Sequence, residues 1–241
     1  MKLIAEMSWQ ATEEYLKKDN RVILPIGATE QHGPHLGLGT DFIEAEAIAH
    51  GTSEATGVAA APTLNYGMSF TNLSFTGTMS LRPTTLIAVL EDLFRSLYRH
   101  GFRRVLVVNG HGGNEAALGS AIHMVSDDLR ELQIKTFSWW TDAEAYRVVV
   151  DQMGPQEGSH ASAGETAFML AACPEGVDLK RLSGRDAPVR PSRDFMDIRR
   201  FREKYPDGIM GLDPKNAARE AGQALLDKCV EICARELRSW E

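Results

Sequence analysis

Side chains of metal-binding type lie close together in the segment ATEQHGPHLGLGTDF, residues 28–42. Glu30 and His32 are two positions apart, and in extended backbone such positions project to the same side. A carboxylate and an imidazole would therefore converge on one point. Asp41 follows a glycine-rich turn and begins a predicted helix, so its carboxylate either caps that helix or bridges two metal ions.

Two further segments carry the same types of side chain. His111 lies in VVNGHGGNEAAL (107–118), among glycines that let backbone or substrate approach closely. His160 and Glu165 flank a run of small residues in GSHASAGETAFML (158–170). Imidazole and carboxylate ligands together suit Zn, Mn or Fe in the divalent state. Two such ions would lower the pKa of water toward neutrality and polarise a carbonyl, which is the chemistry of amide hydrolysis.

Each motif also has a structural interpretation. Asp41 alone is more often a helix cap than a ligand, and NGHGGN alone fits a turn or an anion-binding loop. Glu115 fits a solvated carboxylate that complements a helix dipole. His35 is ambiguous, because it lies near the first cluster while Pro34 shapes the turn. Only the joint placement of the motifs favours a metal site. The histidines expected to be structural lie on predicted helices: His50, His100 and His123.

Alternating strands and helices must position these motifs. Apolar runs predict strands, and amphipathic stretches predict helices. This alternation indicates an α/β sandwich with a mostly parallel sheet, where ligands bind beyond the carboxyl ends of the strands. Residues 184–213 are interpreted as a surface excursion within one domain, 1–241. The predicted strands are 22–28, 58–64, 76–81, 103–110 and 133–139, and the predicted helices are 8–19, 41–56, 83–100, 114–131, 142–153, 163–173 and 214–238.

Composition limits the classes of function. A net charge of -7 argues against nucleic acid as the main partner, and the arginines at 199, 200 and 202 are interpreted as a solvated helix face. Three cysteines indicate reduced thiols in a cytosol, and Cys229 and Cys233 are interpreted as core residues four apart on a helix. The N-terminus lacks the apolar core of a signal peptide, and no apolar run has membrane-spanning length. We therefore expect a cytoplasmic protein without a membrane partner.

The order of the motifs resembles that of the creatininase family, also called creatinine amidohydrolases. EQHGPHL, then an aspartate, then NGHGGN, then H-A-x-x-x-E-T follow one another as they do in that family. The stretches NYGMSFTNLSFTGTMSL (65–81) and DGIMGLDPKNAAREAG (207–222) resemble two further family segments. The resemblance therefore runs through nearly the whole chain.

The resemblance implies a three-layer α/β/α sandwich with two divalent metal ions per chain, and a homo-oligomer, in particular a hexamer. It implies hydrolysis of a C–N bond in a small cyclic amide or formamide by a metal-activated hydroxide. His160 matches the family histidine proposed to protonate the leaving nitrogen, and Glu165 matches a family glutamate near the metals. The residues that match family metal ligands, with the aspartate as the bridge, are Glu30, His32, Asp41 and His111.

Several positions depart from the pattern of creatininase itself. That enzyme has a glutamate ligand two residues after its NGH histidine, where this chain has Gly113. We therefore expect Glu165 to replace it as a ligand and as part of the catalytic site. Asn72 stands where a histidine is common, Thr76 replaces a proline, and Ser162 replaces a glycine. These departures favour a formamide or a modified peptide over creatinine as the substrate.

Other functions compete with this hypothesis. They are creatininase activity proper, a hydrolase with one metal ion, and a non-catalytic metal-binding scaffold of the same fold. A nucleotide-binding protein is disfavoured, because both G-x-G-x-x-G and a G-K-[ST] loop are missing from the sequence. Trp139 and Trp140 follow a predicted strand, where they either wall a pocket or pack in the core.

Overall fold

Four parallel strands form a sheet in the order β2-β1-β3-β4. This computed structural model describes the chain apart from residues 155–157, 183, 185, 189–196, 212 and 241. The predicted α/β fold is confirmed, with every paired strand of the described sheet parallel. The strands are β1 (Arg21–Ile26), β2 (Ala59–Ala60), β3 (Arg104–Asn109) and β4 (Gln133–Phe137).

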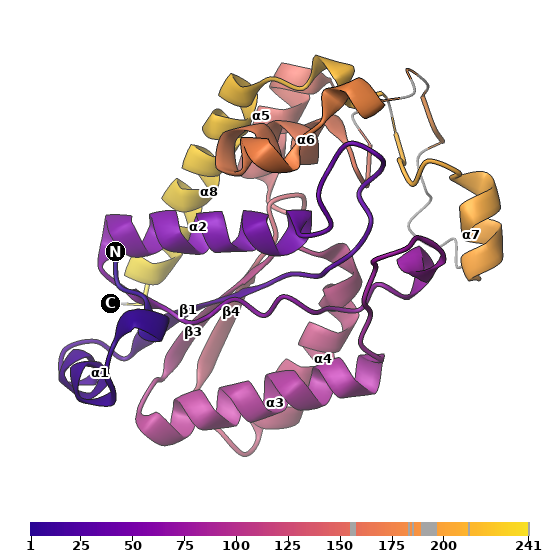
Figure 1. The fold of residues 1–241 in the computed structure, drawn as a ribbon. Helices are drawn as coiled ribbons and strands as arrows, with labels where there is room; N and C mark the ends of the chain where they lie inside the picture. Colours follow the sequence, from indigo (N-terminus) through magenta and orange to yellow (C-terminus); the bar gives the residue numbers. More distant parts are fainter. Residues whose placement is uncertain (155–157, 183, 185, 189–196, 212, 241) are drawn as a thin grey trace.

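Helices cover both faces of the sheet and complete three layers (Figure 1). One face carries α2 (Thr40–Thr56), α5 (Ala143–Met153), α6 (Ala163–Ala172) and α8 (Arg219–Arg238). The other face carries α3 (Pro83–His100) and α4 (Glu115–Ser126). Among the described residues, α1 (Trp9–Leu16) and α7 (Ile198–Lys204) are further helices.

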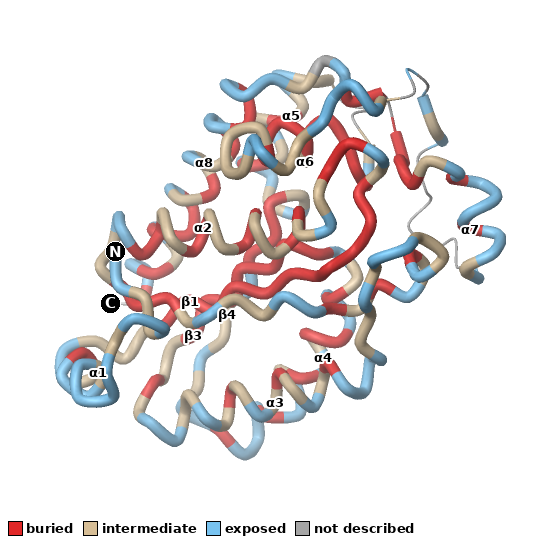
Figure 2. The backbone as a smooth tube through the Cα atoms, in the orientation of Figure 1, coloured by how far each residue is buried: buried red, intermediate tan, exposed pale blue. Residues whose placement is uncertain are grey.

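The two central strands are buried on both faces, which explains their continuous apolar sequences. In β1, Ile23 packs against the α2–α8 side while Val22 and Leu24 pack against the α3–α4 side. In β3, Leu106 packs against the α2–α8 side and Val107 packs against the α3–α4 side. Figure 2 shows the buried run continuing from β1 into the loop that follows it. This loop carries the first group of metal-binding residues, so the core holds its backbone in place.

Local signals explain where several helices begin. Ser8 caps α1 by accepting a hydrogen bond from the backbone N–H of Ala11. Pro83 occupies the first turn of α3, where its missing N–H costs nothing. Short 3-10 helices occupy Ile4–Glu6, Phe70–Ser74 (η2), Gly112–Asn114 (η3), Pro174–Gly176, Leu179–Arg181 and Pro214–Asn216.

Some predicted elements are wrong or shorter. The strand predicted at 76–81 is absent, because this segment makes only isolated bridges, one from Met79 to Thr29. The strand predicted at 58–64 shrinks to β2, because the regular register with β1 breaks after Ala61 and a backbone hydrogen bond to β1 resumes only at Leu64. The helix predicted at 214–238 begins only at Arg219, after a 3-10 turn, and the helix predicted at 114–131 ends at Ser126.

The excursion predicted at 184–213 lies partly outside the described residues. Its described part contains α7, whose arginines are exposed as predicted. Cys229 and Cys233 are buried in the core beside the sheet, which confirms their structural role. None of the described helices combines the length and the apolar character that a membrane span needs.

Candidate active site

The predicted site residues meet at the carboxyl ends of β1 and β3. Glu30 and His32 follow β1, and His111 follows β3 and precedes η3. Asp41 lies in the first turn of α2, and Glu165 lies in the first turn of α6. Parallel strands bring their carboxyl ends to one edge of a sheet, so residues far apart in sequence converge there.

Asp41 lies between two buried imidazoles. Its Oδ1 is 2.9 Å from His32 Nε2, and its Oδ2 is 2.9 Å from His111 Nδ1. Gly39, and not Asp41, is the cap residue of α2, and no side chain caps this helix. The alternative role of Asp41 as a helix cap is therefore wrong, and both of its oxygens face the site.

Backbone carbonyls fix the orientation of both imidazoles. His32 Nδ1 lies 3.2 Å from the carbonyl oxygen of Glu30, and His111 Nε2 lies 3.0 Å from that of Met68. The nitrogen that donates to a carbonyl carries the proton, so the other nitrogen presents a lone pair. These lone pairs face Asp41, and neither His32 Nε2 nor Asp41 Oδ2 has a hydrogen-bond partner among the described residues. Imidazole nitrogens and carboxylate oxygens that converge on one point fit a cation, whether a proton or a metal ion.

Two sets of three ligand atoms that include Asp41 surround this point, and a third set joins Glu30 and His32 to His160. Glu30, Asp41 and His111 form one set, and its members lie within 4.8 Å of one another. His32, Asp41 and Glu165 form the second set. In it, Glu165 Oε1 lies 3.7 Å from His32 Nε2. Asp41 belongs to both sets. The residues and the donor types fit two divalent ions that share one carboxylate.

Carboxylates dominate the electrostatics of the site. Burial disfavours the charged form of His111, but Glu30 and Asp41 outweigh burial and raise the pKa of His111 to about 10. Burial likewise opposes the charged form of His32, yet Asp41 and Glu165 raise the pKa of His32 well above its usual value. Each imidazole thus sits where a positive charge is favoured. A proton and a metal ion compete for this position.

Gly113 has no room for a side chain. A Cβ at this position would lie 2.3 Å from His111 Nε2 and 2.3 Å from the carbonyl oxygen of Met68. Glu165 reaches the site from the opposite side, at the start of α6. Its Oε2 accepts a hydrogen bond from the backbone N–H of Ser162 at 3.1 Å, which leaves Oε1 toward His32. Ser162 accepts in return from the Glu165 N–H, so Ser162 and Glu165 form a capping box.

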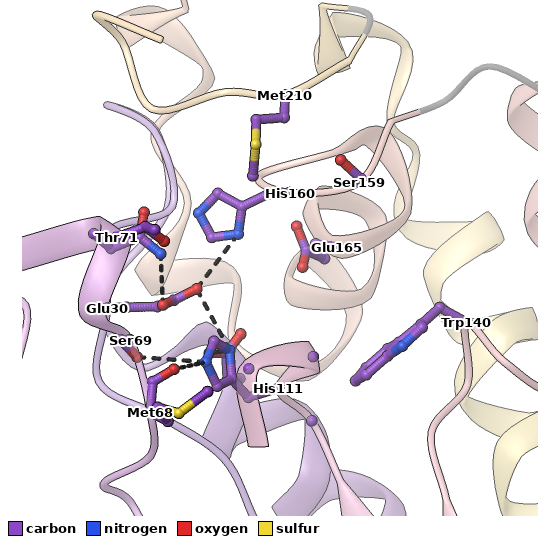
Figure 3. Close-up of a pocket in the computed structure, with 15 residues that line it drawn as sticks. Glu30, Met68, Ser69, Thr71, His111, Trp140, Ser159, His160, Glu165 and Met210 are labelled. Atoms are coloured by element: carbon purple, nitrogen blue, oxygen red, sulfur yellow. Dashed lines mark hydrogen bonds and ion pairs between the residues drawn. The ribbon is translucent and has the colours of Figure 1, made fainter. Parts of the chain in front are cut away.

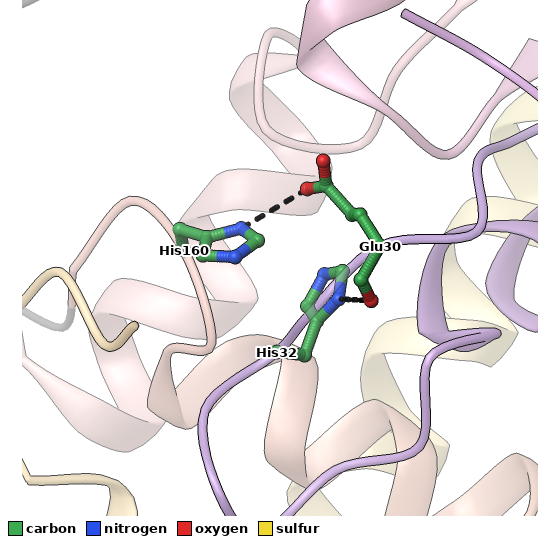
Figure 4. Close-up of side chains that lie close together, drawn as sticks. All are labelled: Glu30, His32 and His160. Atoms are coloured by element: carbon green, nitrogen blue, oxygen red, sulfur yellow. Dashed lines mark hydrogen bonds and ion pairs between the residues drawn. The ribbon is translucent and has the colours of Figure 1, made fainter. Parts of the chain in front are cut away.

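His160 lies beside Glu30 and His32 (Figure 4), and the view of Figure 3 shows it above Glu30. Its Nδ1 is 3.4 Å from Glu30 Oε1, and its ring centroid is 4.3 Å from that of His32. Burial, assisted by the charge of His32, lowers the pKa of His160. The next residue, Ala161, has a φ of 49°, a conformation that L-residues rarely adopt and that often marks functional sites.

A cavity of about 210 Å³ lies among the site residues, with His160 and Met210 on one side of it and Glu30 and His111 on the other (Figure 3). Trp140 lines it, whereas Trp139 is buried in the core and donates from Nε1 to Glu44 Oε2 at 3.1 Å. The two alternatives for the tryptophan pair therefore both apply, one to each residue. Besides the site residues, the lining includes Met68, Ser69, Thr71, Asn72, Ser159 and Met210.

Three buried polar residues around the site were not predicted as site residues: Glu44, Gln31 and Asn72, the last of which was noted only as a departure from the creatininase pattern. Glu44 lies one helical turn after Asp41, and burial together with the charge of Glu165 raises the pKa of Glu44 well above its usual value. Its spacing of three from Asp41 was the available signal. Gln31 and Asn72 contact each other beneath His160. The ambiguous His35 is buried against Thr166 and lies in none of the metal-ligand sets found among the described residues.

Comparisons with known proteins agree with this architecture. The family profile described as "Creatininase: Creatinine amidohydrolase" matches residues 5–237. Creatinine amidohydrolase of Pseudomonas putida is 31% identical over 98% of this chain and 95% of its own. Mycofactocin precursor peptide peptidase of Mycolicibacterium smegmatis is 31% identical over 91% of this chain and 85% of its own. A solved structure described as "Creatininase Mn" has a TM-score of 0.88 and 29% identity, covering 98% of this chain and 97% of its own.

Proposed function

This chain belongs to the creatininase family, and from that premise we propose that it is a hydrolase that cleaves a C–N bond of a small cyclic amide or formamide with the help of divalent metal ions. One observation carries the proposal. The two oxygens of Asp41 each lie 2.9 Å from the lone-pair nitrogen of a different imidazole, which is the arrangement of a bridging carboxylate.

The proposed site holds two ions per chain. Glu30, Asp41 and His111 would hold one ion, and His32, Asp41 and Glu165 would hold the other. Zn, Mn and Fe suit this mixture of imidazole and carboxylate ligands. Ions bound here would lower the pKa of water and polarise the amide carbonyl.

His160 is proposed to transfer protons, and Glu165 is proposed to complete the metal site. Because its pKa is lowered, His160 rests in the neutral form and can accept a proton from the attacking water. It then returns this proton to the leaving nitrogen as the C–N bond breaks. Glu165 directs Oε1 toward His32 and the metal site while α6 holds its other oxygen.

The substrate is proposed to be a formamide or a modified peptide in preference to creatinine. Gly113 has no space for a further ligand, so the site departs from that of creatininase where creatininase places its glutamate. The similarity to a precursor peptide peptidase supports the peptide alternative. Creatininase activity proper is the second candidate, supported by the similarity to creatinine amidohydrolase.

We propose further that residues 1–241 form a single hydrolase domain of a cytoplasmic homo-oligomer, in particular a hexamer. A family profile that matches residues 5–237 supports the single domain. The net charge of -7 supports a small-molecule amide, and neither nucleic acid nor a membrane, as the partner. Light scattering coupled to size exclusion would measure the number of subunits.

A metal-reconstitution assay tests the function. The protein is stripped with a chelator, reloaded with Mn, Zn or Fe, and assayed against creatinine, small formamides and short peptides. We expect turnover only after reloading, with formamides or peptides above creatinine. Turnover that survives complete metal removal would contradict the metal dependence, and efficient creatinine turnover would select the second candidate.

A further inference from the structure

Two buried side-chain amides connect Glu30 to the segment below His160. Asn72 Nδ2 donates to Glu30 Oε2 at 2.7 Å, and Gln31 Nε2 donates to Asn72 Oδ1 at 2.9 Å. At the far end, the backbone N–H of Gly33 donates to Gln31 Oε1 at 2.9 Å. Gln31 and Asn72 are 4% and 5% exposed, so water does not compete for these bonds.

The ends of this amide chain set its direction. The Glu30 oxygen at one end accepts a hydrogen bond from Asn72, and the backbone N–H of Gly33 at the other end can only donate. Turning either amide over would place oxygen against oxygen at one end and nitrogen against an N–H at the other. Asn72 and Gln31 therefore each have one allowed orientation.

The amide chain first fixes the orientation of the Glu30 carboxylate. Its Oε2 is held by Asn72, whereas its Oε1 lies 3.5 Å from His111 Nδ1 and 3.4 Å from His160 Nδ1. Oε1 is therefore the oxygen that points to the metal site. Hydrogen bonds to the outer oxygen of a ligating carboxylate orient it and tune its affinity for a metal.

The amide chain also determines which ring nitrogen of His160 carries the proton. Its Nε2 lies 2.8 Å from the carbonyl oxygen of Gln31 and 2.9 Å from Gln31 Nε2. The two hydrogens of that amide already have acceptors, Asn72 Oδ1 at 2.9 Å and the carbonyl oxygen of Gly208 at 3.2 Å. All acceptors are satisfied only when His160 Nε2 carries a proton and donates it to the Gln31 carbonyl. Nδ1 is then the nitrogen that faces Glu30 and the cavity (Figure 4).

We propose that Asn72 and Gln31 are positioning residues that hold Glu30 as a ligand through Oε1 alone and make Nδ1 the working nitrogen of His160. The inference rests on the proposed function. In the reaction, Nδ1 takes one proton from the attacking water as oxygen bonds to the carbonyl carbon. The electron pair of the C–N bond passes to the leaving nitrogen, and Nδ1 returns the proton to that nitrogen, so one water is consumed.

The position of Gly208 supports the same assignment. A Cβ on this glycine would lie 1.9 Å from Gln31 Oε1, and its φ is +81°. The backbone after α7 thus passes directly over the Gln31 amide. Met210 continues this segment, and its N–H donates to the carbonyl oxygen of His160 at 3.0 Å. Gln31 therefore joins three parts of the site that are distant in sequence.

The first test measures the tautomer in the unchanged protein. Histidines are labelled with ¹⁵N, and long-range ¹H–¹⁵N correlations are recorded on metal-free protein, with the His160 signal identified by its loss in His160→Gln. We expect the proton on Nε2. A proton on Nδ1 would overturn the inference, and this test requires no substitution in the amide chain.

The second test measures metal affinity without substrate. Asn72→Leu removes the donor at similar volume and should weaken Mn binding to apo-protein about 10–100-fold. Asn65→Leu is the matched control, because Asn65 is exposed in the same loop, and it should bind Mn like the wild type. Equal affinity in the two variants would overturn the role of Asn72.

The third test concerns Gln31. Gln31→Met should keep the metal content and KM while lowering kcat about tenfold or more, with a mixture of His160 tautomers. An unchanged tautomer and kcat would overturn its role. A protein that hydrolyses nothing but shows the Nε2 proton and the Asn72 effect would refute the proposed function alone. An active hydrolase with the proton on Nδ1 would refute only this inference.

Discussion

Glu165 divides its two oxygens between the metal site and the end of its own helix. We predict that Glu165→Gln weakens the ion shared with His32 and leaves the ion held by Glu30 and His111 in place. Titration of apo-protein with Mn should then resolve one strong and one weak site. Glu220→Gln is the control, because Glu220 lies exposed in the first turn of α8. Equal weakening of both ions would contradict this division of ligands.

His160 should act on protons and not on metal retention. His160→Ala should lower kcat by about 10²–10⁴-fold, the usual contribution of a general acid or base, and keep both ions. The deficit should shrink for substrates whose leaving amine is weakly basic, since these need less protonation. Rates across a leaving-group series, with metal content measured on the same samples, check this. Loss of metal, or an identical deficit for every leaving group, would exclude the role.

His35 makes folding sensitive to acid. Thr166 donates its hydroxyl to the carbonyl oxygen of Ser162, so His35 Nε2 must donate to Thr166 Oγ1 at 2.9 Å, and Nδ1 lacks a partner. Burial, with His32 nearby, lowers the pKa of His35 to about 4 from 6.5.

The sign of the pH effect follows from these two values. As the pH falls, His35 takes up a proton in the unfolded chain near pH 6.5 but in the folded chain only near pH 4. The free energy of unfolding should therefore fall as the pH is lowered from about 6.5 to about 4. His35→Gln removes the titrating group, so the stability gap between wild type and variant should narrow over this range. Urea unfolding of metal-free protein at several pH values measures the gap. A gap that stays constant with pH would disprove the prediction.

At the scale of elements, α8 holds α6 and thereby Glu165. Gly222 allows the two helices to approach so closely that a Cβ on it would lie 1.8 Å from the carbonyl oxygen of Ala167. Gly222→Ala should therefore destabilise the protein by about 1–3 kcal/mol, because backbone cannot yield as a side chain can. Chemical denaturation measures this change.

Gly119 in α4 is the matched control. A Cβ there would meet nothing within 4 Å, so Gly119→Ala should stabilise the protein by about 0.5–1 kcal/mol through helix propensity. If Gly222→Ala proved as stable as the wild type, the close packing of α6 on α8 would not contribute to the stability of the protein.

At the scale of the whole molecule, the proposed ligands come from segments that follow β1 and β3 and from the starts of α2 and α6. Metal ions should therefore stabilise the folded chain as a unit. At ~1,000 times Kd the gain is about 4 kcal/mol. Thermal unfolding with chelator and with Mn should show a clear rise in midpoint. Asp41→Asn should lose most of this rise, because Asp41 serves both ions, and an equal rise in this variant would contradict the bridge.

The sequence by itself determined the parallel α/β architecture and the first set of candidate ligands. The apolar runs of β1 and β3 are continuous because both faces are covered, and parallel strands place their carboxyl ends at one edge. Local patterns were insufficient at residues 76–81, where β-type residues form only isolated bridges, to Thr29 and Gly67, neither of which lies in a described strand.

Only the tertiary structure decided how these residues face one another. That Asp41 turns its two oxygens to different imidazoles depends on how α2 packs above the ends of β1 and β3. That Asn72 reaches Glu30 across 42 positions depends on the fold of the intervening loop. Side-chain periodicity records which face of an element is buried, but hydrogen bonds between distant segments depend on the packing of whole elements, which no local pattern encodes.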